Sequence, residues 1–482
     1  MVFVLSAMNN LDVCAADIST AFLYGKTREK VYVVAGPEFG ELARRIMIID
    51  KGLYGLKSSA ARFHEHLSAK LRSMGFRPSK ADHDLWLRSA GDHYEYVATY
   101  VDDILAFSQD PMCIINEIKK DYMLKGVGIP EYYLGGNFHT TKDIDNTKEV
   151  GHDEKDKHLS YQWLKYNIET TFSAQTYIHT SIERLERMIG KEFALHNTPM
   201  SEAAHPELDD SVLLISEDHS KFHSLVGCAN CLLTLGRFDV AYAVNSLSRF
   251  SMQPRQGHLK AMIKVFGYLK KFYKGKILID PNYPDHAKFQ TPEYDQWQEF
   301  YPDAQELVPD KSETLPFKGK PVRITVYKDA DHAHDVLTRR SVSGILLFIN
   351  NTPVKWISKR QKTVETSTYG SELVAAKQAV ELVIEYWYAM RMLGASLDGP
   401  AVMLGNNNSV VLNTTMPSSV LKKKHSTCTY LCVHEAIAAK IIKFTHITSD
   451  MNYSDILTKA LPAGSFHALV KPLLFRNPPI GE

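Results

Sequence analysis

Two adjacent aspartates, Asp102 and Asp103, have the residue type and the setting for metal chemistry. They lie in YVDDIL between apolar segments rich in β-branched and aromatic residues, a pattern that predicts a hairpin with both carboxylates at its turn. Neighbouring like charges are costly unless a cation neutralises them, and Mg²⁺ prefers carboxylate oxygens. Asp17, in AADISTAFLYG, would add a third carboxylate, and three carboxylates can hold the two ions of metal-assisted phosphoryl transfer. The alternative is a solvated Asp-Asp turn without a metal.

A second set of acids lies in the last third of the sequence. Asp329 ends the expected strand VRITVYKDAD, and Glu372 lies in the first turn of a long amphipathic helical pattern. Asp455, in YSDILTKAL, follows Ser454, a candidate helix cap. Because these acids come from separate elements, the fold can bring them together at one site. The alternative is that each is a surface acid, and that Glu372 and Asp455 complement helix dipoles.

The elements that must position these acids follow from hydrophobic periodicity, which predicts an α/β fold class. Strand and helix patterns alternate through residues 1–150, and helical patterns dominate residues 151–281 after a polar, His-rich loop at Gly151–Lys165. Residues 282–320 carry several prolines and acidic groups without a sustained period, which predicts a linker. A second α/β domain is expected over residues 321–470.

Composition limits what kind of protein this is. A chain of 482 residues is too long for one core and predicts about two to four domains. Its 56 basic and 55 acidic residues give a net charge of +1, so a nucleic-acid-binding surface would have to be local. Residues 255–276 hold seven basic and no acidic residues, which fits either a phosphate-binding stripe or a solvated helix face. Six irregularly spaced cysteines indicate a reducing compartment, and we expect no membrane span.

The segments DISTAFLYG, LYGLKSSAARF and YVDDIL occur in the order and spacing of copia-type reverse transcriptases, and this part of the chain resembles that family. The resemblance implies a polymerase palm over residues 1–150 and a thumb- or connection-like helical region over residues 151–281. It assigns Asp17, Asp102 and Asp103 to metal binding and catalysis, with Mg²⁺ or Mn²⁺ as the cofactor.

The same resemblance implies substrate-binding roles for three further residues. Phe22, five residues after Asp17, would be the aromatic gate that excludes a ribonucleotide 2′-hydroxyl; the alternative is an ordinary core phenylalanine. Lys57 matches the Lys of the family's LYGLKQAPR stretch and would face template or incoming nucleotide. Arg62 stands one place later than the family's Arg, because Ser58–Ala61 replace Gln, Ala, Pro and Arg. The sequence begins 16 residues before Asp17, where the family has a longer fingers segment, so we expect truncated fingers.

The last third resembles the copia-type ribonuclease H domain. YKDADHAHDVLTRRSVSGILLF, SKRQKTVETSTYGSELVAA and SDILTKALP match it in order over most of residues 321–470. Asp329, Glu372 and Asp455 then correspond to three of its four metal-binding acids, and the fourth position, in GNNNSV, is Asn406. An amide supplies one neutral oxygen where the metals need an anionic ligand. The sequence therefore predicts strongly impaired cleavage of the RNA strand, and faster cleavage by an Asn406→Asp variant.

The function implied by the resemblance is RNA-directed DNA synthesis, with a ribonuclease H domain, in a copia-type retrotransposon polyprotein. The implied partners are an RNA template, a DNA primer, an RNA/DNA hybrid and deoxynucleotide triphosphates, and the chain would self-associate or pair with an intact copy. The implied location is intracellular, in cytoplasmic virus-like particles with entry into the nucleus. Two alternatives remain: a catalytically inactive nucleic-acid-binding transposon remnant, and a structural subunit of an intact polymerase.

Overall fold

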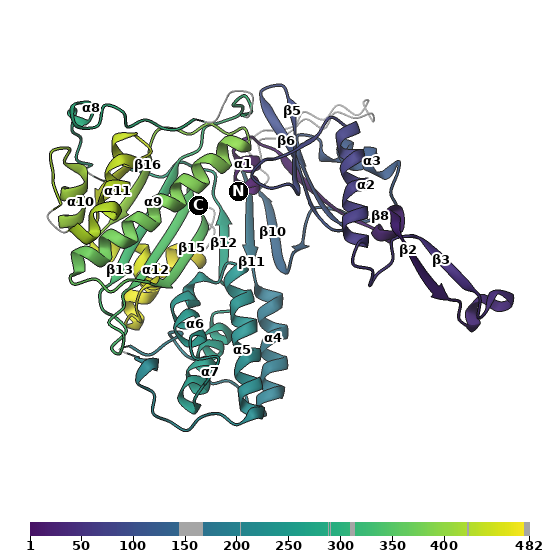
Figure 1. Ribbon diagram of the computed structural model, residues 1–482, viewed down its shortest axis with the longest axis horizontal. Coiled ribbons are helices and arrows are strands. Elements are labelled where there is room, and N and C mark those ends of the chain that lie inside the picture. Colours follow the sequence, from purple (N-terminus) through teal and green to yellow (C-terminus); the bar gives the residue numbers. More distant parts are fainter. Residues whose placement is uncertain are drawn as a thin grey trace, which may run out of the picture.

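The fold is α/β, as the sequence predicts, and contains three sheets with flanking helices and a projecting ribbon (Figure 1). The computed structural model describes these residues: 1–143, 167–202, 204–287, 289, 291–308, 314–421 and 424–476. The expected loop Gly151–Lys165, and with it the start of the region 151–281, lies outside the described residues. Among the described residues, no helix is both long and apolar enough to cross a bilayer.

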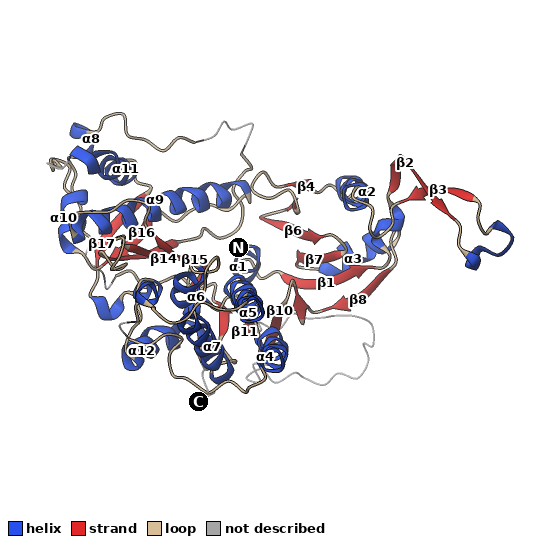
Figure 2. Ribbon diagram, turned by 60° about the horizontal axis from the view of Figure 1, so that its bottom comes forward, coloured by secondary structure: helices blue, strands red, loops and turns tan. Residues whose placement is uncertain are grey.

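The first sheet carries the first set of acids, and Figure 2 shows its strands β6, β7, β1 and β8 beside the helices α2 and α3. Its six strands are, in order across the sheet, β4 (Arg77–Pro78), β5 (Leu85–Ala90), β6 (His93–Tyr100), β7 (Asp103–Ser108), β1 (Asp12–Ile18) and β8 (Leu124–Gly128). Two helices cover one face, α2 (Ser59–Ser73) and α3 (Pro111–Lys119). Phe63 and Leu67 of α2, and Ile114 and Ile118 of α3, bury their side chains against it at the helical spacing of three to four residues.

The opposite face of the first sheet packs against α1 (Val2–Met8) and against the last third of the chain. Across this contact the Tyr96 hydroxyl donates a hydrogen bond to the Leu393 carbonyl at 3.1 Å. Gly394 lies so close to the Tyr94 ring that a Cβ there would come within 2.2 Å of it, and its φ of 73° favours glycine. The two ends of the chain therefore share one hydrophobic core.

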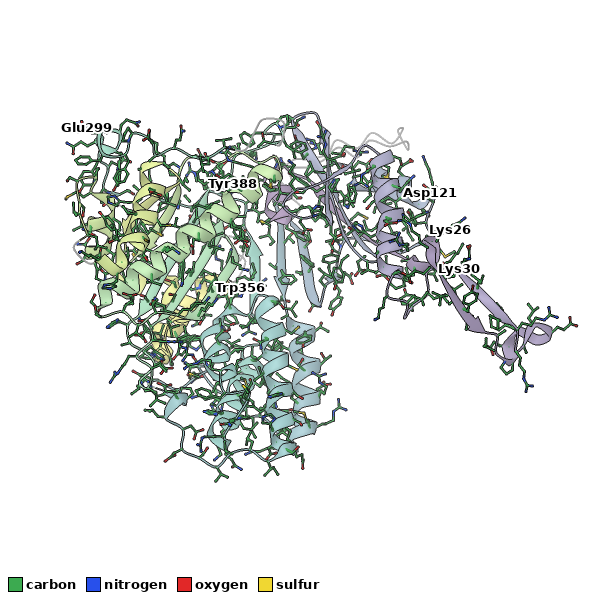
Figure 3. All side chains as sticks on the ribbon, in the orientation of Figure 1. Lys26, Lys30, Asp121, Glu299, Trp356 and Tyr388 are labelled. Atoms are coloured by element: carbon green, nitrogen blue, oxygen red, sulfur yellow. The ribbon has the colours of Figure 1, made fainter. Side chains whose placement is uncertain are left out.

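A two-stranded ribbon projects from the first sheet, at the right of Figure 1. Its strands are β2 (Lys26–Val34) and β3 (Ile46–Lys51), and they follow the short 3₁₀ helix η1 (Ala21–Tyr24) and enclose another, η2 (Pro37–Leu42). Lys26 and Lys30, labelled in Figure 3, lie along β2. Both strands are mostly exposed, so the ribbon adds little to the core.

The second sheet has the strand order β12-β11-β10-β9 and is antiparallel. Its strands are β9 (Tyr132–Tyr133), β10 (Gly136–Asp143), β11 (Asn167–Ser173) and β12 (Lys276–Ile279). Because β10 pairs with β11, this sheet crosses residue 150, where the sequence prediction placed a domain boundary. The helices below it in Figure 1 are α4 (Gln175–Ile189), α5 (Ser216–Thr234), α6 (Ala241–Ser248) and α7 (Gln256–Lys271), with η3 (Pro206–Leu208) and η4 (Phe238–Val240) between them.

A buried ion pair fixes the helical region internally. Arg237 donates two hydrogen bonds to the Asp239 carboxylate, at 3.0 and 2.7 Å, and the Tyr268 hydroxyl of α7 donates a third at 2.7 Å. The side chains of Arg237 and Asp239 are 1% and 0% exposed. A charge pair this deep is tolerated only because each partner neutralises and hydrogen-bonds the other.

The third sheet is mixed and carries the second set of acids. Its strands, in order across the sheet, are β15 (Thr352–Arg360), β14 (Val342–Ile349), β13 (Ile324–Asp331), β16 (Ala401–Gly405) and β17 (Ile442–His446). The first three are antiparallel to one another, and β16 and β17 run parallel to β13. Trp356 of β15, labelled in Figure 3, donates a hydrogen bond to the Leu233 carbonyl at 3.1 Å and so joins this sheet to α5.

The long helix α9 (Thr368–Met392) confirms the expected amphipathic helix, and Ser367 caps it by accepting a hydrogen bond from the Gly370 amide. The other helices of this domain are α10 (Asn408–Thr415), α11 (Thr427–Ala438) and α12 (Ala463–Leu474), with the short 3₁₀ helices η5 (Lys424–Ser426), η6 (Ser449–Met451) and η7 (Tyr453–Leu457). Helix α9 packs on β13, so the same interface brings Glu372 to the strand that carries Asp329.

The segment 282–320, expected to be a linker, is docked on the last domain. Its one regular element among the described residues is the short helix α8 (Trp297–Phe300), which Figure 2 shows beside α11. Tyr388 of α9, labelled in Figure 3, donates to the Leu307 carbonyl at 2.5 Å. His434 of α11 is fully buried between the hydroxyls of Tyr430 and Tyr301, at 2.8 and 2.9 Å. Aromatic contacts, which have no periodic signature in sequence, hold this irregular segment.

Replacing Asp239 by Ala should lower the free energy of unfolding by about 3–5 kcal/mol, because Arg237 would stay charged in a dry interior. Chemical unfolding followed by circular dichroism measures the change. Glu381→Ala is the matched control, since Glu381 pairs with Lys377 on the exposed face of α9 and should matter by less than about 1 kcal/mol. Equal losses in the two variants would contradict the structural role of the buried pair.

Burial lowers the pKa of His434 to about 4, below its usual value near 6.5. The folded protein therefore resists protonation that the unfolded chain accepts, so stability is complete above the usual pKa and is lost as the pH falls toward 4. The thermal midpoint of the parent should fall more steeply between pH 7 and pH 4 than that of His434→Gln. His83→Gln, at an exposed turn, should keep the parent's slope; a parallel slope for His434→Gln contradicts the assignment.

Candidate active sites

The first set of acids meets where two neighbouring strands end. Asp17, near the end of β1, is the antiparallel partner of Asp103, the first residue of β7. The Ile18 amide donates to the Asp102 carbonyl at 2.8 Å, which ties the hairpin turn to β1. Figure 2 shows β7, β1 and β8 side by side. The structure thus confirms the hairpin and brings all three aspartates to one edge of the sheet.

The turn that presents Asp102 and Asp103 is tight. Tyr100 pairs with Asp103, so only Val101 and Asp102 connect the strands, and Val101 has a φ of 54°. A β-branched residue is unfavourable in this left-handed region, and such strain persists only where the surrounding structure enforces it. Here the pairing of β7 with both β6 and β1 enforces it.

Burial and repulsion shape the electrostatics of the first site. Burial, followed by the charges of Asp102 and Asp17, raises the pKa of Asp103. Asp17 Oδ1 is buried and accepts no hydrogen bond, and the ammonium of Lys125 on β8 lies 3.2 Å from it. Lys125 is 64% exposed, so this contact is weakly held. Sequence reasoning missed Lys125, because its role depends on β8 pairing beside β1, with Lys125 opposite Asp17.

The three residues with expected substrate roles lie around this edge. Phe22, in η1, is partly buried, with its ring centroid 4.6 Å from that of Tyr54. Lys57 is exposed in the loop before α2. Arg62, on α2, donates to Glu65 at 2.8 Å, so its guanidinium is engaged within its own helix. The structure places all three near the first sheet and leaves their roles as predictions.

The basic residues of α7 are largely engaged with neighbouring segments. Lys270 pairs with Glu186 at 2.8 Å, Lys271 bonds the Asn197 side chain at 2.6 Å, and Lys264 bonds the Ser201 hydroxyl at 2.6 Å. Lys260 is exposed. Among the residues of this helix, most of the positive charge therefore stabilises the helical region itself.

The second set of acids is more deeply buried. Asp329 on β13, Glu372 on α9 and Asp455 on η7 are 2%, 4% and 5% exposed. The Thr458 hydroxyl donates to Asp329 at 2.6 Å, and the Lys459 ammonium lies 3.0 Å from Asp455 and 3.6 Å from Asp329. The structure therefore brings Asp329 and Asp455 to one cation.

Glu372 is neutralised separately. The ammonium of Lys328, on the same strand as Asp329, donates to the Glu372 carboxylate at 2.8 Å. Burial raises the pKa of Glu372, and burial together with the charge of Asp329 raises the pKa of Asp455 to about 7. Sequence reasoning missed both lysines, although Lys328 directly precedes Asp329 and Lys459 lies in the quoted SDILTKALP.

Asn406 follows the end of β16. Its amide nitrogen donates to the Ser449 hydroxyl at 3.2 Å, and its side-chain oxygen is buried without a hydrogen-bond donor. Asp455 Oδ1 is likewise buried without a donor, so Asn406 and Asp455 each keep an acceptor that no protein group satisfies.

The two sites differ in how well they suit a divalent cation. Within the described part of the chain, no three His, Cys, Asp or Glu side chains are gathered as a ready metal site. At the first site the donor chemistry fits, because three carboxylates share one edge and Asp17 Oδ1 has no hydrogen bond. Among the described residues, the one ammonium paired with these acids is that of the exposed Lys125. At the second site each of the three acids already contacts a lysine, because Lys328 binds Glu372 and Lys459 lies between Asp329 and Asp455.

Residues 1–152 match the family described as reverse transcriptase (RNA-dependent DNA polymerase). Nearly the whole chain aligns with the retrovirus-related Pol polyprotein of transposon RE1 from Arabidopsis thaliana, at 24% identity over 96% of this chain and 27% of that protein. Over most of its length the chain is similar to retrotransposon Pol polyproteins. It also matches a transposon Ty5-1 protein of Saccharomyces cerevisiae, at 27% identity over 76% of this chain and all of that protein.

Solved structures similar to the chain include a foamy viral protease-reverse transcriptase in complex with RNA/DNA hybrid, with a TM-score of 0.39 and 11% identity over 92% of this chain and 45% of that one. Another is the N-terminal RNase H domain of a Mycobacterium tuberculosis protein, with a TM-score of 0.22 and 13% identity over 31% of this chain and 98% of that one. The chain spans about a quarter of the Arabidopsis polyprotein's length. Reverse transcriptase and ribonuclease H-like folds generally use divalent metals.

Replacing Lys125 by Met should tighten Mn²⁺ binding at the first site by about 2- to 5-fold, because it removes an exposed competing charge beside Asp17. Titration followed by the electron paramagnetic resonance signal of free Mn²⁺ measures this, with Asp17→Asn as the variant that removes the site. Lys119→Met, exposed at the end of α3, is the charge-matched control and should bind as the parent does. Unchanged or weaker binding by Lys125→Met contradicts competition between the lysine and the ion.

Proposed function

We propose that the first site catalyses RNA-directed DNA synthesis by metal-dependent phosphoryl transfer. The observation that carries the proposal is the convergence of Asp17, Asp102 and Asp103 at the ends of paired strands within a reverse transcriptase domain. Phosphoryl transfer depends on positioning and charge neutralisation more than on covalent chemistry, and a strained turn held by two strand pairings supplies positioning.

The three aspartates would hold Mg²⁺ or Mn²⁺, and such ions would supply activation of the primer hydroxyl and neutralisation of charge on the pyrophosphate. The chain's own contribution is to orient the carboxylates and to keep Asp17 Oδ1 free of protein hydrogen bonds. Burial and the charges of Asp102 and Asp17 raise the pKa of Asp103, and a bound cation would offset that repulsion. Phe22 lies shortly after Asp17, where an aromatic ring would limit the space beside the sugar of the incoming nucleotide.

The proposed partners are an RNA template, a DNA primer, the resulting RNA/DNA hybrid and deoxynucleotide triphosphates, with self-association or pairing with an intact copy as a further interaction. The structure of the foamy viral protease-reverse transcriptase contains an RNA/DNA hybrid, which is a partner of that protein. An intracellular location, in cytoplasmic particles with nuclear entry, belongs to the same proposal; all six cysteines are free thiols.

The ribonuclease H-like domain is proposed to cleave RNA poorly. Asn406 leaves a neutral oxygen at the end of β16, where the family has an acid, and that oxygen has no hydrogen-bond donor. A second candidate function is a nucleic-acid-binding remnant without catalysis. The neutral oxygen of Asn406 favours this candidate, but only for the last domain. The aspartates of the first sheet distinguish the two candidates.

Primer extension on an RNA template with Mg²⁺ and deoxynucleotides should give products that fall at least ~100-fold in the Asp102→Asn, Asp103→Asn double variant, because the ion ligands are lost. Asp295→Asn, Asp303→Asn makes the same charge change at exposed positions outside the sheet and should extend as the parent does. No extension by folded parent protein would reject DNA synthesis and favour the binding remnant. A gel shift with an RNA/DNA hybrid at several salt concentrations then tests binding directly.

A further inference from the structure

Lys328 occupies a position in which a lysine is seldom found. Its side chain is fully buried, and its ammonium donates to Glu372 at 2.8 Å. The ammonium also lies over the Phe444 ring of β17, 5.2 Å from the ring centroid. Lysine is almost never fully buried unless it is paired. Here the pairing partner is itself one of the acids of the second site.

The neighbouring strand is shaped to admit this side chain. A Cβ at Gly405, the last residue of β16, would lie 2.4 Å from Lys328 Cε and 3.0 Å from its nitrogen. Glycine at 405 therefore leaves the space through which the lysine stem passes. Asn406 comes next in the chain, so the missing acid and the added ammonium occur at the same edge of the sheet.

A second ammonium serves the other two acids. Lys459 contacts both Asp455 and Asp329, and Thr458 fills a further acceptor position on Asp329. Each of the three carboxylates thus has an ammonium partner, whereas at the first site, within the part of the chain that the structure describes, only Asp17 has one, from an exposed lysine. Buried charges need such partners, and a site that already has them gains less from a metal ion.

We infer that the second site holds the ammonium groups of Lys328 and Lys459 in place of divalent metal ions. Lys328 is the residue that excludes the cation, because its buried stem has no solvent to move into and its charge would repel an arriving ion at short range. The inference rests on the proposed ribonuclease H ancestry of this site, and it is independent of DNA synthesis at the first site.

The buried ammonium of Lys328 changes what the Asn406→Asp substitution is expected to do. Restoring the acid by Asn406→Asp alone leaves Lys328 bound to Glu372, so the single variant should not gain a metal site. Removing the ammonium and restoring the acid together should create one. The two substitutions are thus expected to act as a pair, with a gain that neither produces alone.

The test is Mn²⁺ binding by the full chain, followed by electron paramagnetic resonance, in an Asp102→Asn, Asp103→Asn background that silences the first site. The background protein should bind no Mn²⁺ beyond the amount bound after a further Asp329→Asn substitution. Adding Lys328→Met and Asn406→Asp together should give stoichiometric binding that Asp329→Asn removes. The charge-matched control carries Lys355→Met together with Asn406→Asp. Lys355 is an exposed lysine on β15 of the same sheet, so this control protein should gain no Mn²⁺ binding.

Stoichiometric, Asp329-dependent binding by the background protein itself would overturn the inference, and this measurement needs no change at Lys328. Absence of a gain in the Lys328→Met, Asn406→Asp protein, shown to be folded by its thermal transition, would also overturn it. Lys328→Gln, which keeps a donor for Glu372, replaces Lys328→Met if the latter does not fold. Primer extension is not read in this test, so its outcome is separable from that of the proposed function.

Discussion

Repulsion between carboxylates that the fold brings together is the constraint on which both sites depend. Each site collects three acids from different elements, and such a collection is stable only when cations offset the repulsion and the loss of hydration. At the first site this repulsion is offset only in part: one exposed lysine lies beside Asp17, and the pKa of Asp103 is raised. The second site has two lysines for its three acids, one bound to Glu372 and one between Asp329 and Asp455. This difference in compensation separates a site open to an ion from one that is internally satisfied.

The same fold fixes both sites on one framework. The hydrophobic cluster behind the first sheet continues into α9 and the third sheet, and the Tyr96 to Leu393 hydrogen bond crosses that contact. The helical region packs in turn on β14 and α12. Because interiors are densely packed, the sheets cannot shift far relative to one another without breaking shared contacts. The last domain therefore stays packed against the rest of the core whether or not its acid site is active.

Sequence reasoning succeeded where the controlling interaction is local or where motifs occur in order. The hairpin around Asp102 and Asp103 followed from strand patterns on both sides of a short turn, and the capped helix α9 from its periodicity. The partners of the acids were not predictable, since Lys125 meets Asp17 only when β8 pairs beside β1, and Lys328 is buried only by α9 and β16. Residues 282–320 show no sustained hydrophobic period, so the sequence predicts a linker there. The contact of Tyr301 with His434, which docks this segment, leaves no periodic pattern in the sequence.

Asn406 and Lys328 are best understood as one electrostatic change. Loss of an acid removes a negative charge from this edge of the sheet, and a buried ammonium adds a positive one, so both make the site less dependent on bound cations. With the lysine alone, an acid at 406 would still have offered a ligand to an ion. With the amide alone, Glu372 would have remained buried without a partner, which is costly. Together they would let the domain fold and pack without a bound metal ion, because each buried carboxylate still contacts an ammonium group.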